Sequence, residues 1–319
     1  MMRAAMPRAD RLPFGLVAAA ALALAGCVTA GDPAEEPAPV AVGFDGSMDQ
    51  VELTASIGGR PYTFLLDTGT DPSALDLAVA REVGAPLPAT PSGTAAGVGE
   101  GSPPIFETRI PSLQLGAAQL GPVDAVAMDM SRLRPTRPVA GILGYSFLRG
   151  RVVLIDYPRN RVTIFASSAQ AERWAASCRQ RHVARLQSIE GDVMPIIPNF
   201  RFGRSSGPVS VDTGSSQSIG LFRSALRLPA LRNGISLGED ISMTGARGTV
   251  RAPAGMLRVP IGFGPYRLQA GQAVHLRSDE EVSAGRVANV GNRTFRAMGL
   301  SLLLDYKSGR IGFMRGCRP

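Results

Sequence analysis

Two short stretches carry the residues that can do chemistry, and the two are alike. Asp67-Thr68-Gly69-Thr70 follows the apolar run Phe64–Leu66, and Asp212-Thr213-Gly214-Ser215 follows the run Val209–Val211. Each apolar run is typical of a buried strand and each glycine of a tight turn. Each Asp is therefore expected on a loop at the end of a strand.

The surroundings of the two stretches also repeat. The interval from Asp67 to Gly144 is 77 residues, and the interval from Asp212 to Gly291 is 79 residues. A strand ending in Asp-Tyr reaches its Asp 89 residues after Asp67 and 93 residues after Asp212. Features in the same order at nearly the same intervals indicate an internal duplication.

The duplicated units are strand-rich, with few helical segments. We expect an all-β fold with a few short helices, in which two homologous β-barrel-like lobes, residues 47–166 and 193–319, are related by a pseudo-twofold axis. Between them, residues 167–192 form a linker, with a helix favoured from a Ser167 cap to about Arg181.

Several smaller elements follow from the same reading. Val51–Ile57, Gly58-Gly59 and Tyr62–Leu66 predict a hairpin that leads into Asp67, and 71–80 predicts a turn and then a helix. The Gly-rich segment 93–102 suits either a hairpin tip that covers a cleft or an ordinary surface loop. In the second unit, Met243–Gly248 is the expected counterpart of that segment, and Leu257–Ile261 is the expected counterpart of the strand at Leu113.

A pseudo-twofold arrangement would bring the two carboxylates together at the lobe interface. Two carboxylates held that close share one proton, because both cannot ionise cheaply. The charged member can then deprotonate a water, while the protonated member hydrogen-bonds a carbonyl oxygen. We expect Asp67 and Asp212 to be the catalytic pair, with no cofactor and no metal beyond that water.

The residues after each Asp are expected to support the pair. The hydroxyls of Thr70 and Ser215 are placed to donate to the outer carboxylate oxygens. Threonines can bond across the interface, and glycines permit the turn and leave N–H groups that face the acids. These further supporting residues are Thr68, Gly69, Thr213 and Gly214.

Over about residues 47–315 the chain resembles the pepsin/retropepsin superfamily of aspartic proteases. The resemblance is carried by the two Asp-Thr-Gly-Thr/Ser stretches, by Ile142-Leu143-Gly144, and by a weaker Asn289-Val290-Gly291. It implies the acid protease fold and an aspartic endopeptidase acting on peptides or unfolded proteins. It also implies that the segments at Gly144 and Gly291 thread behind the Asp loops.

The flaps depart from part of this superfamily. Pepsin-like enzymes carry a Tyr on one flap, and no Tyr lies between Asp67 and Gly144. The two Gly-rich segments are more similar to paired retropepsin flaps, fused here into one chain. Because two lobes already complete the site, we expect a monomer.

The N-terminus predicts export. Basic residues precede the apolar stretch Phe14–Ala25, which is too short to span a bilayer as a permanent helix. Leu24-Ala25-Gly26-Cys27 resembles the lipobox of bacterial lipoproteins, which implies a signal peptide over residues 1–27, acylation of Cys27 and a membrane anchor; an ordinary signal peptide remains the alternative. Val28, rather than Asp, favours the outer membrane, facing the periplasm, and residues 28–46 read as a flexible tether.

Composition limits the other classes of function. The formal charge of +8 comes almost wholly from arginine, with Lys307 the sole lysine, and no basic cluster interleaved with aromatics suggests nucleic-acid binding. With Cys27 acylated, Cys178 and Cys317 form an even pair in an oxidising compartment, either as a disulfide or as separate thiols. The two histidines favour neither a metal site nor a Ser-His-Asp mechanism.

Two alternatives to a protease stay open at this point. One is a catalytically silent lipoprotein that uses the same fold to bind a peptide or an envelope partner. The other is a two-domain β-rich ligand-binding or assembly lipoprotein in which the Asp loops cap strands. Intact acids in both stretches favour the enzyme over the silent lipoprotein, and side-chain oxygens of Asp67 and Asp212 beyond hydrogen-bonding reach would exclude both the catalytic pair and the protease.

Overall fold

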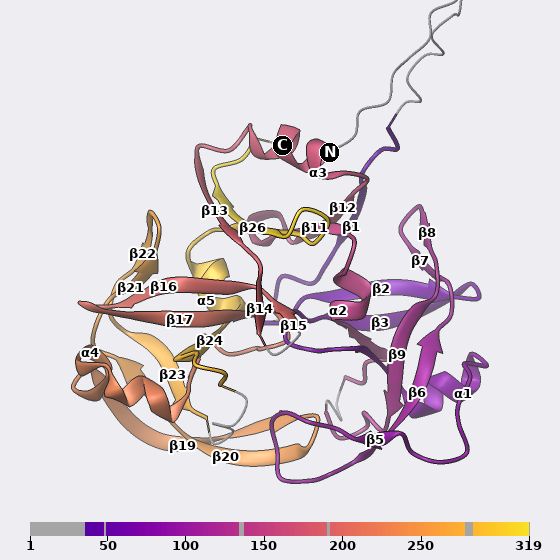
Figure 1. Ribbon diagram of the computed structural model, residues 1–319, viewed down its shortest axis with the longest axis horizontal. Helices are drawn as coiled ribbons and strands as arrows, with labels where there is room; N and C mark the ends of the chain where they lie inside the picture. The colour runs from indigo at the N-terminus through magenta and orange to yellow at the C-terminus, as the bar shows by residue number, and fades with distance from the viewer. Residues whose placement is uncertain (1–35, 48, 134–136, 190–191, 278–282, 319) are drawn as a thin grey trace, which may run out of the picture. The chain divides into compact units, whose positions relative to one another are not determined.

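Strands make up 48% of the chain and form two nine-stranded sheets, one six-stranded sheet and one two-stranded sheet (Figure 1). The structure is a computed structural model that describes residues 36–319, except 48, 134–136, 190–191, 278–282 and 319. The predicted lipobox with Cys27 lies outside the described residues. The predicted all-β, two-lobe architecture is confirmed.

The N-terminal lobe is built on a nine-stranded sheet with the order β5-β6-β9-β4-β10-β3-β2-β7-β8. Its strands are β2 (Glu52–Ile57), β3 (Arg60–Leu66), β4 (Ser73–Asp76), β5 (Gly93–Thr94), β6 (Pro104–Ile110), β7 (Leu113–Leu115), β8 (Ala118–Leu120), β9 (Val123–Met128) and β10 (Gly141–Leu143). Two short helices accompany them, α1 (Leu77–Glu82) and α2 (Tyr145–Leu148). The β2–β3 turn is the predicted Gly58-Gly59, and both glycines have positive φ, as such a tight hairpin requires.

The C-terminal lobe repeats this sheet position by position, in the order β19-β20-β23-β18-β24-β17-β16-β21-β22. Its strands are β16 (Ile196–Phe202), β17 (Ser205–Asp212), β18 (Ile219–Leu221), β19 (Ile235–Gly245), β20 (Gly248–Leu257), β21 (Ile261–Phe263), β22 (Tyr266–Leu268), β23 (Gln272–Leu276) and β24 (Ala288–Gly291). The helices are η2 (Arg223–Arg227), α4 (Pro229–Arg232) and α5 (Asn292–Ala297). The parallel pairs also repeat, since β10 runs parallel to β3 and β24 runs parallel to β17.

The third sheet joins the lobes, in the order β1-β12-β11-β25-β26-β13. Its strands are β1 (Val40–Gly43), β11 (Val152–Asp156), β12 (Arg161–Phe165), β13 (Gln180–Arg185), β25 (Ser301–Asp305) and β26 (Arg310–Arg315). The 3-10 turn η1 (Tyr157–Arg159) links β11 to β12, and a separate hairpin, β14 (Gln187–Ile189) with β15 (Asp192–Met194), follows β13. The central pair, β11 with β25, brings together one strand from each lobe.

Buried apolar side chains hold these layers together. One core cluster runs through both lobes and includes Phe64 and Leu143 from the first and Val211 and Val290 from the second. A second cluster lies between the joining sheet and α3 (Ser168–Ala175). The apolar runs that precede the two Asp residues are therefore core strands, and the packing of these strands fixes the start of each loop that follows.

Four predicted segments differ in the structure. Residues 40–43, predicted to belong to a tether, form β1, because the segment completes the edge of the joining sheet against β12. The helix predicted to continue to Arg181 ends at Ala175, because Gln180–Arg185 pairs with β26. Within 71–80 a strand, β4, precedes the helix because it pairs with β9 and β10. The counterpart of β7 is β21 at 261–263, not 257–261.

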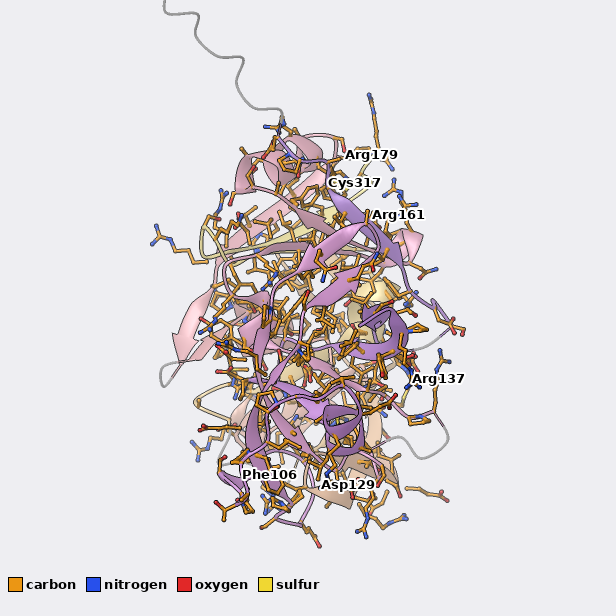
Figure 2. The ribbon with its side chains drawn as sticks, turned by 90° about the vertical axis from the view of Figure 1, so that its right-hand side faces the viewer. Phe106, Asp129, Arg137, Arg161, Arg179 and Cys317 are labelled. Carbon is orange, nitrogen blue, oxygen red and sulfur yellow. A yellow bond between two sulfur atoms is a disulfide. The ribbon has the colours of Figure 1, made fainter. Side chains whose placement is uncertain are left out.

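A disulfide links Cys178, which follows α3, to Cys317, which follows β26. The sequence separation of the two cysteines is 139 residues, so the bond closes a loop that contains nearly the whole C-terminal lobe. Cys317 and Arg179 lie at one end of the molecule, and Phe106 and Asp129 lie at the other end (Figure 2). The bond therefore fastens the chain end to the linker at one end of the molecule.

Removing this bond should lower the stability of the fold. Because a long loop gains much freedom in the unfolded chain when it is opened, the double variant Cys178→Ser/Cys317→Ser should lose about 2–4 kcal/mol of unfolding free energy. Urea unfolding followed by circular dichroism measures the change. Ser177→Ala, next to the bond, is the control and should keep the parental midpoint. An unchanged midpoint in the double variant would show that the bond does not stabilise the fold.

Candidate active site

Each Asp loop is suspended between two parallel strands of its own lobe. In the first lobe, the backbone N–H of Asp67 donates to the carbonyl oxygen of Leu143 on β10, at 3.0 Å. In the second lobe, Asp212 ends β17 and pairs in register with Gly291 on β24. The two loops thus occupy equivalent positions, and the duplication alone would place both acids at the boundary of the lobes.

Thr68 and Thr213 tie the two loops together across that boundary. The hydroxyl of Thr68 donates to the carbonyl oxygen of Val211 at 2.7 Å, and the hydroxyl of Thr213 donates to that of Leu66 at 2.8 Å. Each hydroxyl also accepts from the backbone N–H of the other threonine, at 3.0 and 3.1 Å. Both side chains are buried, so four bonds shielded from water fix the spacing of the loops.

The inner oxygens of the two carboxylates share a donor. The backbone N–H of Gly214 donates both to Oδ1 of Asp67 and to Oδ1 of Asp212, at 3.1 Å in each case. Oδ1 of Asp67 also accepts from the N–H of Gly69 at 2.7 Å, and Oδ1 of Asp212 accepts from the N–H of Ser215 at 3.1 Å. The two acids therefore lie on either side of one peptide group.

Glycine is required at position 214 by this close approach. A Cβ atom built there would overlap the carboxylate of Asp67, so any other residue would push the acids apart. At Gly69 the same construction places the Cβ 3.1 Å from Oδ1 of Asp212, which is tight but less severe. Each loop thus leaves room for the acid of the other lobe.

The outer oxygens have different donors in the two lobes. Oδ2 of Asp67 accepts from the hydroxyl of Thr70 at 2.6 Å, as the sequence predicts. For Asp212 the sequence predicts the hydroxyl of Ser215, but the donor to Oδ2 is the side-chain amide of Asn289, at 3.2 Å. The hydroxyl of Ser215 instead accepts from the N–H of Gln217 at 3.2 Å.

The environment of Asp67 raises its affinity for a proton. Burial of the Asp67 carboxylate, followed by the nearby charge of Asp212, raises the pKa of Asp67 to about 6, against the lowering effect of its hydrogen bonds from Thr70, Gly69 and Gly214. This is the behaviour expected of two carboxylates that share a site, where one holds a proton well above the usual pH. The geometry can supply an acid and a base side by side.

Gly144 and Gly291 lie directly behind the loops. A Cβ at Gly144 would overlap the carbonyl oxygen of Thr70, and a Cβ at Gly291 would overlap that of Gln217. These glycines therefore allow β10 and β24 to pass close to the Asp loops, which is the threading that the resemblance implies. In the second lobe, Asn292 adds two bonds from its amide, at 2.7 Å to Thr213 O and 3.0 Å to Ser215 O.

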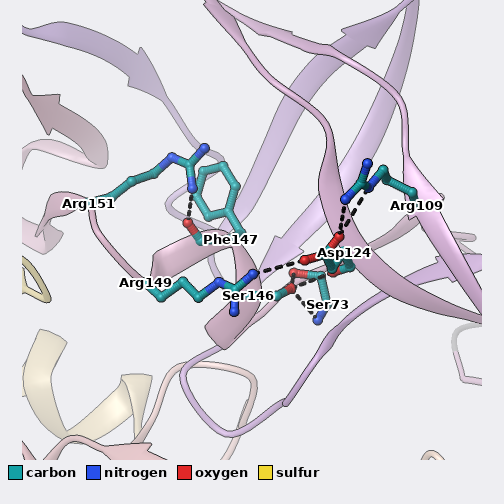
Figure 3. A network of polar contacts seen from close by, with 7 residues as sticks. All are labelled: Ser73, Arg109, Asp124, Ser146, Phe147, Arg149 and Arg151. Carbon is teal, nitrogen blue, oxygen red and sulfur yellow. Dashed lines mark hydrogen bonds and ion pairs between the residues drawn. The ribbon is translucent and has the colours of Figure 1, made fainter.

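A polar network supports the first loop from the outside. The hydroxyl of Ser146 on α2 donates to the carbonyl oxygen of Asp124 at 2.6 Å and lies 2.8 Å from the hydroxyl of Ser73. Ser73 in turn accepts from the N–H of Gly144 at 3.0 Å. Arg109 and Arg149 both bind the carboxylate of Asp124, which holds α2 against β9 (Figure 3). No sequence pattern indicates this network, because its members are far apart in the chain.

The two Gly-rich segments meet as a pair of flaps. The N-terminal flap is the loop between β5 and β6, the C-terminal flap is the β19–β20 hairpin, and Figure 1 shows both on the same side of the molecule. Arg247, at the tip of the hairpin, donates from its backbone N–H to Val98 O at 3.0 Å and accepts from Gly101 N at 2.7 Å. Residues of the segment 93–102 therefore contact the tip of the opposite hairpin, as the prediction of a covering hairpin tip requires.

No helix among the residues that the structure describes is both long enough and apolar enough to cross a membrane.

Removing one threonine of the Thr68–Thr213 pair, whose four hydrogen bonds join the lobes, should loosen both loops. Thr68→Val keeps the shape but deletes two bonds in a buried place, so the free energy of unfolding should fall by about 1–3 kcal/mol. Thermal or urea unfolding measures the loss, and the exposed Thr54→Val on β2 is the matched control. Equal unfolding midpoints for the two variants would contradict a structural role for the hydrogen bonds of Thr68 and Thr213.

Comparison with known proteins agrees with this geometry. Residues 53–147 match a family model described as "Aspartyl protease", and the matched segment contains Asp67, its loop and the Gly144 strand. A search of curated proteins found no match. The C-terminal lobe, beyond the matched segment, repeats the matched lobe strand for strand. The match over residues 53–147 supports an aspartyl protease family, consistent with the pepsin/retropepsin-like superfamily.

Proposed function

We propose that the protein is an aspartic endopeptidase in which Asp67 and Asp212 together activate a water molecule. The observation that carries the proposal is the shared Gly214 N–H, which accounts for two carboxylates meeting at the lobe interface. A role in binding alone would not need an acid from each lobe at this point. The silent and the strand-capping alternatives both lack a reason for the raised pKa of Asp67, to about 6.

The reaction follows from the two protonation states. The ionised carboxylate takes a proton from a water held between the pair, and the resulting hydroxide adds to the carbonyl carbon of the peptide. The protonated carboxyl donates its proton toward the carbonyl oxygen as charge develops there. When the tetrahedral intermediate collapses, the leaving nitrogen takes up a proton from the pair and one hydroxyl of the intermediate gives its proton back to the pair as the new carboxyl group forms, so the two carboxyls again share one proton.

The substrate reaches this water beneath the flaps. The bonds between Arg247 and the opposite flap, at Val98 and Gly101, must open to admit a chain and can close again over it. An extended peptide, or an unfolded stretch of protein, fits such an entrance better than a folded domain does. Because one chain supplies both acids, the proposed active species is a monomer.

Cleavage should depend on both acids and on acidic pH. The protein should cut an unstructured peptide mixture, with inhibition by pepstatin-type compounds, and Asp67→Asn or Asp212→Asn should each lower kcat/KM by about a thousandfold or more. Since the protonated form of Asp67 prevails below about pH 6 and is lost as pH rises through that value, kcat/KM should fall above about pH 6. Mass spectrometry of the products measures both effects.

Asp45→Asn is the matched control, because this exposed carboxylate bonds Ser47 and lies outside the site. It should cleave like the parent protein. Cleavage that survives Asp67→Asn and Asp212→Asn would refute the assignment, and a folded protein that cuts nothing at any pH would favour the silent lipoprotein.

We also propose that the enzyme acts in the bacterial envelope, attached by a lipid on Cys27 and facing the periplasm from the outer membrane. The support is the order of basic, apolar and small residues that ends in Leu24-Ala25-Gly26-Cys27. β1, the first strand among the described residues, begins at Val40, so a short tether would separate the lipid from the fold.

The anchor can be tested by labelling. Cells that express the full chain should incorporate labelled palmitate into the protein, and Cys27→Ala should abolish the label, because only the cysteine thiol can accept the first lipid. In the same variant, cell fractionation should find the protein outside the membrane fraction. Cys178→Ala, at one of the cysteines of the disulfide, is the control that should keep its label. Label retained in Cys27→Ala would overturn the proposal.

A further inference from the structure

The residues that pair across neighbouring strands beside Asp212 are more polar than the equivalent row of paired residues beside Asp67. Strand pairing aligns one such row across each lobe, on the same face of the sheet as the acid. In the first lobe the row is Leu65, Ile142, Ala74 and Val126. In the second lobe it is Ser210, Asn289, Gly220 and His275. Two otherwise equivalent lobes thus carry an apolar row and a polar row beside their acids.

Three side chains of the second lobe form a chain of hydrogen bonds that ends on Asp212. Nη1 of Arg286 donates to the hydroxyl of Ser210 at 3.1 Å. That hydroxyl donates to Oδ1 of Asn289 at 2.5 Å, and Nδ2 of Asn289 donates to Oδ2 of Asp212 at 3.2 Å. Ser210 is 1% exposed and Arg286 is 6% exposed, so water competes little for the bond between them, while Asn289 and Asp212 are half-buried.

The direction of the chain follows from the chemistry of its first member. A guanidinium group can only donate, so the hydroxyl oxygen of Ser210 accepts from Arg286 and its hydrogen needs an acceptor. The nearest acceptor is Oδ1 of Asn289, which leaves Nδ2 pointing at Asp212. The reverse orientation of the amide would set two acceptor oxygens against each other unless Asp212 carried a proton there.

The donor to Asp67 imposes no such direction. A hydroxyl can donate or accept, so Thr70 can remain bonded to Oδ2 of Asp67 whether or not that oxygen carries a proton. The amide of Asn289 fits only an unprotonated Oδ2 on Asp212. In the first lobe the positions equivalent to Arg286 and Asn289 are Val139 and Ile142, which cannot provide a second relay.

We propose that Arg286, Ser210 and Asn289 are positioning residues that act as a directed hydrogen-bond relay, which keeps Asp212 as the general base and leaves the proton on Asp67. The inference rests on the proposed function, since it assigns the two roles within that pair. The pKa of Asp67, raised to about 6 by burial and by the charge of Asp212, agrees with this assignment. The relay itself is defined by the three distances above.

Other charged or titratable groups face this part of the site from several elements. Asp67 faces it from the first loop, and the buried His275 lies on β23, in the same row as Asn289. Arg277 and Arg286 both lie over the ring of Phe222, at 5.0 and 5.6 Å from its centroid. A change in the pH profile must therefore be traced to Asp212 itself, which decides the design of the test.

The first test compares pH profiles of kcat/KM for the full-length protein. Asn289→Leu keeps the size of the side chain but removes the donor, so the acidic limb, which reports ionisation of the base, should move up by about one pH unit. The alkaline limb should move less. Ser210→Ala, which frees the amide to turn over, should shift the acidic limb in the same direction by a smaller amount. Ile142→Leu, at the equivalent position of the first lobe, is the matched control and should shift neither limb.

The second test does not require activity. In protein labelled with ¹³C at the aspartate side-chain carboxyl, the Asp212 signal is identified by its loss in Asp212→Asn and is titrated in the parent and in Asn289→Leu. An upward shift of its midpoint by about one unit supports the relay even in a protein that cuts no peptide.

Identical midpoints overturn the relay and leave the protease proposal standing. Absence of cleavage with a shifted midpoint overturns the protease and leaves the relay standing. A thermal unfolding midpoint close to that of the parent verifies that each variant is folded.

Discussion

One backbone N–H, that of Gly214, lies between two carboxylates that would otherwise repel each other. This contact has two requirements, and other parts of the structure meet them. The acids must be brought within reach of one donor, which the paired threonines achieve by fixing the distance between loops. They must also be shielded from water, which raises the cost of charging both and so keeps one proton on the pair.

Much of this arrangement can be predicted from the chain alone, because it is repeated. Equal spacings around Asp67 and Asp212 imply equivalent loops, and hydroxyl residues beside each Asp imply local donors. The strand order of the two lobes agrees position by position. Repetition is informative here because a feature found twice in the same context constrains both copies.

The sequence was less informative where contacts are made between distant segments. Residues 40–43 look like a tether because a lone edge strand has no signal beyond short alternation, and only pairing with β12 reveals it. Ser73–Asp76 has turn residues around it, yet sheet pairing on both sides outweighs local propensity. Asn289 was visible only as a weak match to a hydrophobic motif, and its bond to Asp212 depends on the register of β17 with β24.

The joining sheet, with β11 of one lobe beside β25 of the other, has a consequence for how such a protein can diverge. Were each lobe a separate, identical chain, every substitution would appear on both sides of the axis, and a residue suited to one acid would be imposed on the other. Linking the lobes in a single chain removes that constraint. Ile142 and Asn289 can then occupy equivalent places, and the two halves are free to specialise.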